Sequence, residues 1–214
     1  MRPICKAILA VLVVFCLNGF ASARAETARL LVLGDSLTAG YGLERASGFT
    51  RQLEAALVAR GFDINVINAG VSGDTTAGGL SRVDWALTEL QGAEKSLVLV
   101  ELGANDGMRG FDPAVTEANL RAIIARIQAK GHPVLLAGML AFPNLGAEYG
   151  TEFNAVFETL AREMDVTFYP FFLDGVAAEA DLNQDDGIHP NAQGVAVIVK
   201  RILPTVLEAL GQGG

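Results

Sequence analysis

The stretch "RLLVLGDSLTAGYG" (residues 29–42) joins an apolar run to a loop rich in glycine and hydroxyl side chains. Residues 29–34 are apolar at nearly every position, which is typical of a strand buried on both faces. Similar runs follow at residues 64–70, 96–103, 133–140 and 166–170. Such strands belong in a parallel sheet whose two faces are covered by helices.

Segments with helical periodicity lie between these runs. Apolar residues recur at spacings of three and four within residues 49–61, 80–90, 112–131 and 153–164. Asp112 followed by Pro113 is typical of a helix start, and a last helix is expected from about Asn191, with Pro204 bending or breaking it. The alternation predicts an α/β fold, a doubly wound three-layer α/β/α arrangement with about five parallel strands.

The first 25 residues form a separate segment. Arg2 and Lys6 precede an apolar run over residues 7–17, and small residues then lead to Ala25. This is the pattern of a secretory signal peptide, and the run is short for a membrane span. We therefore expect a signal peptide at 1–25, one domain at 26–214, and a periplasmic or secreted location. An uncleaved N-terminal anchor is the alternative.

Removal of residues 1–25 changes the formal net charge from −8 to −11, because three basic residues and no acidic ones are lost. Both cysteines, Cys5 and Cys16, lie in this segment, and a cysteine-free domain suits an oxidising compartment. An acidic domain is a poor partner for nucleic acid or an anionic membrane. We expect neither nucleic-acid binding nor stable membrane insertion after cleavage.

Residues that carry chemistry follow the ends of the predicted strands. Ser36 comes just after the first strand, Gly73 ("NAGVSGDTT") after the second, and Asn105 ("GANDGMRG") after the third. Asp186 and His189 lie in "DDGIHP" (185–190), before the last helix. Ligands of doubly wound sheets bind at the carboxyl ends of the strands. The five residues are therefore expected to meet, as acyl transfer through a serine ester requires.

Ser36 needs a base, and the chain has two histidines. His132 directly precedes a predicted strand, which places it at the opposite edge of the sheet. His189 is left as the base, and Asp186, three residues earlier, can orient its ring. The alternative is that Ser36 only caps the following helix and that residues 185–190 are an ordinary polar turn.

The oxyanion of such a reaction needs preorganised donors. The candidates are the N–H groups of Ser36 and Gly73 and the side-chain amide of Asn105. Turn formation is the alternative role for Asn105. We expect Asp35 and Asp106 to brace these loops rather than to react.

Four blocks of this sequence resemble those of the SGNH, or GDSL, hydrolase family, in the family's order. They are "GDSL" (34–37), Gly73 within "SGDTT", "GAND" (103–106) and "DGIH" (186–189). The amino-acid sequences of these blocks are similar to those of one subgroup, the periplasmic thioesterase I, lysophospholipase and arylesterase enzymes. The resemblance implies a flavodoxin-like SGNH hydrolase fold and a serine esterase without metal or cofactor. It also implies Ser36 as nucleophile, His189 as base, Asp186 as its orienting acid, and Gly73 and Asn105 as oxyanion donors.

The expected substrates are small acyl esters: aryl and other carboxylic esters, acyl thioesters or lysophospholipids. We expect a shallow cleft fringed by Leu37, Met108, Phe111 and Phe142, with residues 140–150 influencing substrate choice. The alternative for these four residues is that they only pack the loops.

Four alternatives stay open at this point. An acyltransferase or a carbohydrate O-acetyl esterase could use the same site. A Mg²⁺-dependent phosphatase could use Asp181, Asp185 and Asp186. A Rossmann-type nucleotide-binding module fits the strand–helix order, but the chain has neither a G-x-G-x-x-G nor a GK[ST] loop. A non-catalytic binding protein is the fourth.

If His189 is the base, activity should rise with pH through a single ionisation near the histidine reference value, roughly 6.5. The measurement is kcat/KM for a neutral ester from about pH 5 to 8. A flat profile over this range would contradict the role of His189.

Overall fold

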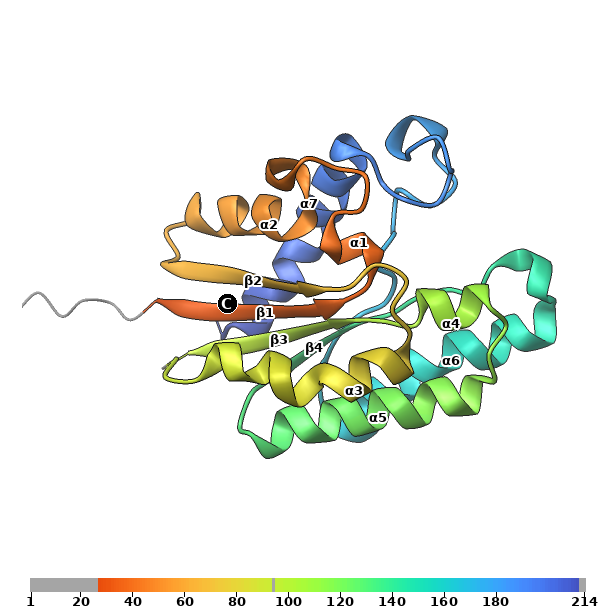
Figure 1. Ribbon diagram of the computed structural model, residues 1–214, viewed down its shortest axis with the longest axis horizontal. Coiled ribbons are helices and arrows are strands. Elements are labelled where there is room, and N and C mark those ends of the chain that lie inside the picture. The colour runs from red at the N-terminus through yellow and green to blue at the C-terminus, as the bar shows by residue number, and fades with distance from the viewer. Residues whose placement is uncertain (1–26, 94, 212–214) are drawn as a thin grey trace, which may run out of the picture.

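The computed structural model describes residues 27–93 and 95–211, so the expected signal peptide at 1–25 lies outside the described residues. One five-stranded parallel sheet lies at the centre of the fold (Figure 1). Its strands are β1 (Ala28–Gly34), β2 (Ile64–Gly70), β3 (Ser96–Glu101), β4 (Val134–Ala137) and β5 (Thr167–Tyr169). The spatial order β2-β1-β3-β4-β5 is that of flavodoxin-like folds.

All five predicted strands are confirmed, and every neighbouring pair is parallel. The central strands are buried on both faces: Leu30–Leu33 of β1 and Leu97–Val100 of β3 have no exposed surface. This double burial explains why their sequences are continuously apolar. β3 and β4 end earlier than predicted, because the chain after Glu101 and Ala137 turns into the loops that build the carboxyl edge of the sheet.

Helices cover both faces (Figure 1). α2 (Phe49–Val58) and α7 (Ala192–Ala209) pack together on one face, while α3 (Thr76–Ala86), α5 (Pro113–Ala129) and α6 (Ala147–Met164) cover the other. The predicted helices are therefore confirmed, and Asp112 caps α5 as expected. Among the helices of the described residues, none combines the length and the apolar character that a bilayer span requires.

α7 continues through Pro204, so the break considered for this position does not occur. Pro204 removes one backbone hydrogen bond, but its neighbours Ile202, Leu203 and Val206 are buried. Packing of this apolar stripe compensates for the lost hydrogen bond.

Several short elements were not expected. α1 (Ser36–Ala39) follows β1 and α4 (Ala104–Met108) follows β3, both at the carboxyl edge of the sheet. The predicted stripe over residues 80–90 divides into α3 and a 3-10 turn, η2 (Leu87–Leu90). The other 3-10 turns are η1 (Arg45–Ser47), η3 (Pro143–Leu145) and η4 (Ala180–Leu182).

Candidate active site

Ser36 is the first residue of α1, immediately after the strand end at Gly34. Asp35 caps this helix, because its Oδ1 accepts the Leu37 N–H at 3.0 Å. The alternative role for Ser36, as helix cap, is therefore filled by its neighbour. The Ser36 hydroxyl instead lies 3.0 Å from Nε2 of His189.

Asp186 and His189 form a compact unit within one turn. Oδ1 of Asp186 accepts the N–H groups of Ile188 (3.0 Å) and His189 (2.9 Å), and Oδ2 lies 2.7 Å from His189 Nδ1. These hydrogen bonds lower the pKa of the Asp186 carboxyl to about 2. An ionised carboxylate can only accept, so Nδ1 carries the ring proton. Nε2 of a neutral ring is then free to accept the Ser36 hydroxyl proton.

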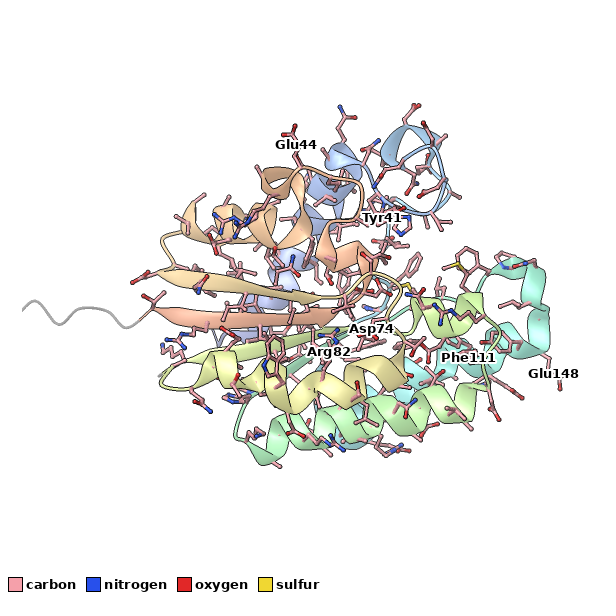
Figure 2. All side chains as sticks on the ribbon, in the orientation of Figure 1. Tyr41, Glu44, Asp74, Arg82, Phe111 and Glu148 are labelled. Carbon is pink, nitrogen blue, oxygen red and sulfur yellow. The ribbon has the colours of Figure 1, made fainter. Side chains whose placement is uncertain are left out.

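This turn is tied to the loop that follows Ser36. The Gln184 N–H donates to the His189 carbonyl at 2.7 Å, and its side-chain amide donates to the Tyr41 carbonyl at 2.8 Å. The Tyr41 ring, labelled in Figure 2, lies 4.5 Å from the His189 ring, centroid to centroid. Contacts on both sides therefore hold His189 over Ser36.

The three candidate oxyanion donors come from separate loops. Asn105, which is 7% exposed, lies in the first turn of α4, and its Nδ2 donates to Asp35 Oδ2 at 3.1 Å. Gly73 has φ +80°, a conformation that favours glycine. Among the backbone hydrogen bonds between the described residues, none has the N–H of Ser36 or Gly73 as donor. Both N–H groups are thus free for a ligand.

The expected bracing by the two aspartates is confirmed. Asp35 holds Asn105 and Leu37, as described above. Asp106 is 1% exposed and accepts the N–H of Thr76 at 2.9 Å and its hydroxyl at 2.5 Å. It thereby joins the loop after β3 to the start of α3.

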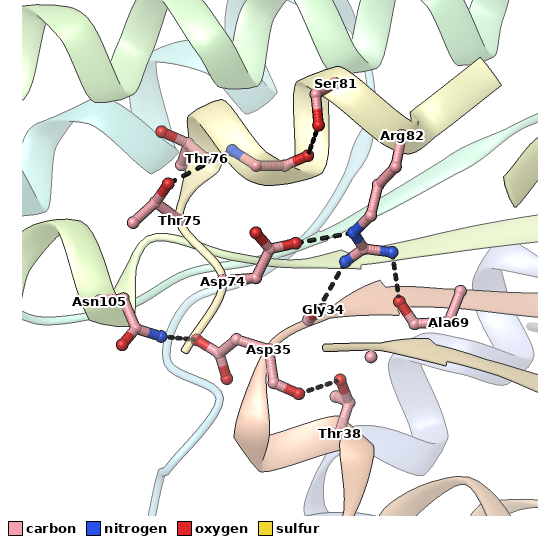
Figure 3. A network of polar contacts seen from close by, with 12 residues as sticks. Gly34, Asp35, Thr38, Ala69, Asp74, Thr75, Thr76, Ser81, Arg82 and Asn105 are labelled. Atoms are coloured by element: carbon pink, nitrogen blue, oxygen red, sulfur yellow. Dashed lines mark hydrogen bonds and ion pairs between the residues drawn. The ribbon is translucent and has the colours of Figure 1, made fainter. Parts of the chain in front are cut away.

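Arg82 of α3 makes a further connection that the sequence analysis did not anticipate (Figure 3). Its guanidinium donates to Asp74 Oδ2 at 2.7 Å, to the Ala69 carbonyl at 2.6 Å and to the Gly34 carbonyl at 2.9 Å. One side chain therefore links the end of β1, the end of β2 and the residue next to Gly73. It sets the position of the Gly73 loop relative to Ser36.

Burial raises the pKa of the Asp35 carboxyl to about 6, although hydrogen bonds from Leu37 and Asn105 lower it. Asp35 is fully buried, and no cationic side chain of the described residues is bonded to it, so its charged form is poorly solvated. As pH falls through this value, Asp35 gains a proton and Asn105 loses its anionic acceptor. A second group therefore titrates in the range where the sequence predicted one ionisation.

His132 lies where it was expected, before β4 at the amino edge of the sheet. Its Nδ1 is 2.8 Å from the Ser96 hydroxyl at the start of β3. Within residues 27–93 and 95–211, no group of three or more His, Cys, Asp or Glu side chains could hold a metal ion.

A cavity of about 380 Å³ opens beside Ser36, Asn105 and His189. Its walls are mainly apolar and include Leu37, Met108 and Phe142, as expected. The expectation for Phe111 is wrong, because this residue does not line the cavity. Its carbonyl accepts the Tyr149 hydroxyl at 2.9 Å, which turns this segment toward α6.

Further walls come from two segments. Leu140, Ala141, Phe142 and Pro143 belong to the stretch 140–150, which was expected to influence substrate choice. The segment from Phe171 to Ala178 was not expected, and it contributes Phe171, Leu173, Ala177 and Ala178.

Three residues at this edge, Tyr41, Arg82 and Glu101, were not predicted from the sequence. The sequence around Tyr41 and Arg82 does not indicate their contacts at the site, because their partners are distant in sequence. Glu101 does carry a local signal: it is a single acidic residue at the end of the apolar run "SLVLVE".

Comparison with known proteins places this geometry in context. The family model described as GDSL-like Lipase/Acylhydrolase matches residues 32–197. An arylesterase of Vibrio mimicus is 39% identical over 186 residues, 87% of this chain and 90% of the relative. The "thioesterase 1/protease 1/lysophospholipase L1" of Escherichia coli K12 is 41% identical over 172 residues, 80% of this chain and 79% of the relative. A crystal structure of TesA superposes with a TM-score of 0.80 at 38% identity, covering 85% of this chain and 99% of that one.

Replacing Arg82 with Met should lower the kcat of ester hydrolysis by about tenfold to 10²-fold with little change in KM, because it would displace Gly73, the expected oxyanion donor, and even a small displacement of such a donor is costly. Arg126→Met is the matched control, since exposed Arg126 donates to Asp84 and to the Leu80 carbonyl on the outer surface. Equal losses of kcat in the two variants would show that Arg82 has no special role.

Proposed function

The chain belongs to the GDSL-like lipase/acylhydrolase family and is an ester-bond hydrolase, and on this premise we propose that it acts through an acyl intermediate on Ser36. The observation that carries the proposal is the continuous contact from Ser36 through His189 to Asp186, with distances of 3.0 Å and 2.7 Å. A serine, a base and an orienting acid at such distances are what nucleophilic catalysis requires.

In the acylation step, His189 Nε2 takes the hydroxyl proton of Ser36 while Oγ forms a bond to the substrate carbonyl carbon. The electron pair of the carbonyl moves to its oxygen. When the carbonyl reforms, the bond to the leaving oxygen or sulfur breaks, and the leaving group takes the proton from His189. An ionised Asp186 stabilises the imidazolium between these events.

In the deacylation step, water occupies the position that the leaving group vacated. His189 takes one proton from this water as its oxygen bonds to the acyl carbon. The bond to Ser36 Oγ then breaks, Oγ regains the proton, and the free acid leaves.

The negative oxygen in both steps would be bound by the N–H groups of Ser36 and Gly73 and by the Asn105 amide. Two features support this role. The backbone hydrogen bonds of the described residues leave both N–H groups without an acceptor, and Asp35 holds the Asn105 side chain from behind at 3.1 Å. Preorganised donors of this kind need no rearrangement during the reaction.

We propose that the substrates are carboxylic esters, including aryl esters, together with acyl thioesters and lysophospholipids. The apolar cavity of about 380 Å³ supports an acyl or aryl group beside Ser36. Two relatives are named for arylesterase, thioesterase and lysophospholipase activity. The basic and apolar pattern of residues 1–25 supports export, after which residues 26–214 would act as one domain in the periplasm or outside the cell.

The test of the mechanism compares two serines that each lie next to a histidine. Ser36→Ala should lower kcat on p-nitrophenyl esters by at least about 10⁴-fold, because nucleophile and base act as a unit. Ser96→Ala, at the His132 pair, should leave activity within about twofold. A fluorophosphonate should label wild type at Ser36 and leave Ser36→Ala unmodified.

Comparable labelling or activity in Ser36→Ala would contradict the acyl-serine mechanism. The same assays separate the alternatives. An acyltransferase needs an acceptor other than water. Release of the free acid when water is the sole acceptor therefore identifies a hydrolase. Activity that survives strong chelation excludes a Mg²⁺-dependent phosphatase.

The cavity walls generate a prediction on chain length. Phe142→Ala should raise KM for long-chain p-nitrophenyl esters by about fivefold, because part of an apolar contact area is lost, and should leave the acetate ester nearly unchanged. Phe111→Ala is the control: it is about as exposed as Phe142, 41% against 37%, but lies outside the cavity. If both variants change the chain-length profile alike, the acyl group binds elsewhere.

A further inference from the structure

Glu101 is the only charged residue of β3 and the last residue of that strand. It has no exposed surface. In the sheet it pairs with Gly34 of β1, two residues before Ser36. A carboxyl group is therefore enclosed directly beneath the segment that carries the nucleophile.

The surroundings of Glu101 leave half of its carboxyl group unsatisfied. Oε2 accepts the Asp35 N–H over a long 3.4 Å, and the Thr38 hydroxyl and the Asp35 side chain lie within hydrogen-bonding reach. Oε1 is buried and has no hydrogen-bond partner among the described residues. Gly34 makes room for this group, because a Cβ there would lie 2.7 Å from Glu101 Oε2.

Two carboxylates cannot both remain ionised in such a position without a cation between them. Burial, and then the charge of Asp35, raise the pKa of Glu101 well above its ordinary value. The other charged or titratable groups nearby are Asp74, Arg82 and His189. Arg82 donates to Asp74 and to backbone carbonyls and has no hydrogen bond to either buried carboxyl group. The proton of the pair therefore resides on Glu101.

We propose that Glu101 is a positioning residue that works as a neutral carboxylic acid: it donates a hydrogen bond to the Asp35 carboxylate, which in turn orients the Asn105 amide toward the substrate oxygen. This inference rests on the proposed function of Asn105. It extends the site inward by one residue, as a chain of hydrogen bonds from Glu101 to Asp35 and from Asp35 to Asn105. A buried acid that stays neutral in order to donate is an established device in catalysis.

Glu101→Gln and Glu101→Leu distinguish a donor from a space-filling group. Glutamine keeps the shape and a donor, so kcat should stay within about threefold of wild type. Leucine removes the donor, so kcat should fall by about 10²-fold while KM changes little, which is the cost of losing one oxyanion contact. Glu54→Gln is the control, because Glu54 is also a glutamate whose Oε2 accepts a backbone N–H, that of Val66 at 2.9 Å, but it lies away from the site. The kcat of this variant should equal that of wild type.

Infrared difference spectroscopy tests the protonation state independently of turnover. The wild-type minus Glu101→Gln spectrum at about pH 8, where Asp35 is ionised, should contain the carbonyl band of a protonated carboxylic acid that shifts in D₂O. A spectrum with only carboxylate bands overturns the proposal. Circular dichroism would show whether Glu101→Leu folds. If it does not, the kcat of Glu101→Gln and this spectrum still test whether Glu101 is a neutral donor.

Equal losses of kcat in the Gln and Leu variants would also overturn the proposal. Failure of the proposed function has a different signature, because Ser36→Ala would then retain activity or fluorophosphonate labelling. If Ser36 passes its tests and Glu101→Gln is as impaired as Glu101→Leu, only the role of Glu101 is wrong.

Discussion

The hydrogen bond between Ser36 and His189 spans 153 positions of the chain, and the rest of the site depends on it. Neither residue can hold the other in place alone. Ser36 is fixed because β1 is the second strand of the sheet and is paired on both sides. His189 lies on a turn whose position is set by the capped start of α7 and by Gln184, which bonds to the loop after Ser36. The parallel sheet thus converts a long separation in sequence into a contact of 3.0 Å.

The carboxyl groups of the site divide into two environments. Asp186 is partly exposed and receives three hydrogen bonds, which keep it charged. Asp35 and Glu101 are enclosed, and burial raises the pKa of both. Because the pKa of Asp35 is raised to about 6 in the folded state, the stability present at acidic pH is lost as pH rises through this value and Asp35 ionises. At neutral pH the ionised Asp35 therefore opposes folding, which favours a functional reason for its buried position over a purely structural one.

Much of the fold could be predicted from the sequence because double burial leaves a direct signature. Leu30–Leu33 and Leu97–Val100 are apolar at every position, and the residues that follow each strand end must share one edge. The same reasoning placed Ser36, Gly73, Asn105, Asp186 and His189 near one another. It did not find Arg82, because its carbonyl partners Gly34 and Ala69 are backbone groups that any residue could supply. The burial of Glu101 could not be predicted either, because burial of a single acidic side chain depends on which other side chains cover the end of the strand.

The cavity shows why chemistry was easier to predict than substrate preference. Ser36, Asn105 and His189 need defined atoms at defined distances, and few residue types can supply them. The apolar walls need only volume and hydrophobicity, which many residues supply equally well. Phe111 and Phe142 look alike in sequence and in exposure, yet only Phe142 reaches the cavity, because Tyr149 of α6 holds the backbone of Phe111. The cavity walls thus depend on loop packing around residues 139–143 and 171–178, while the residues of the proposed mechanism lie at the ends of the strands and in the turn before α7.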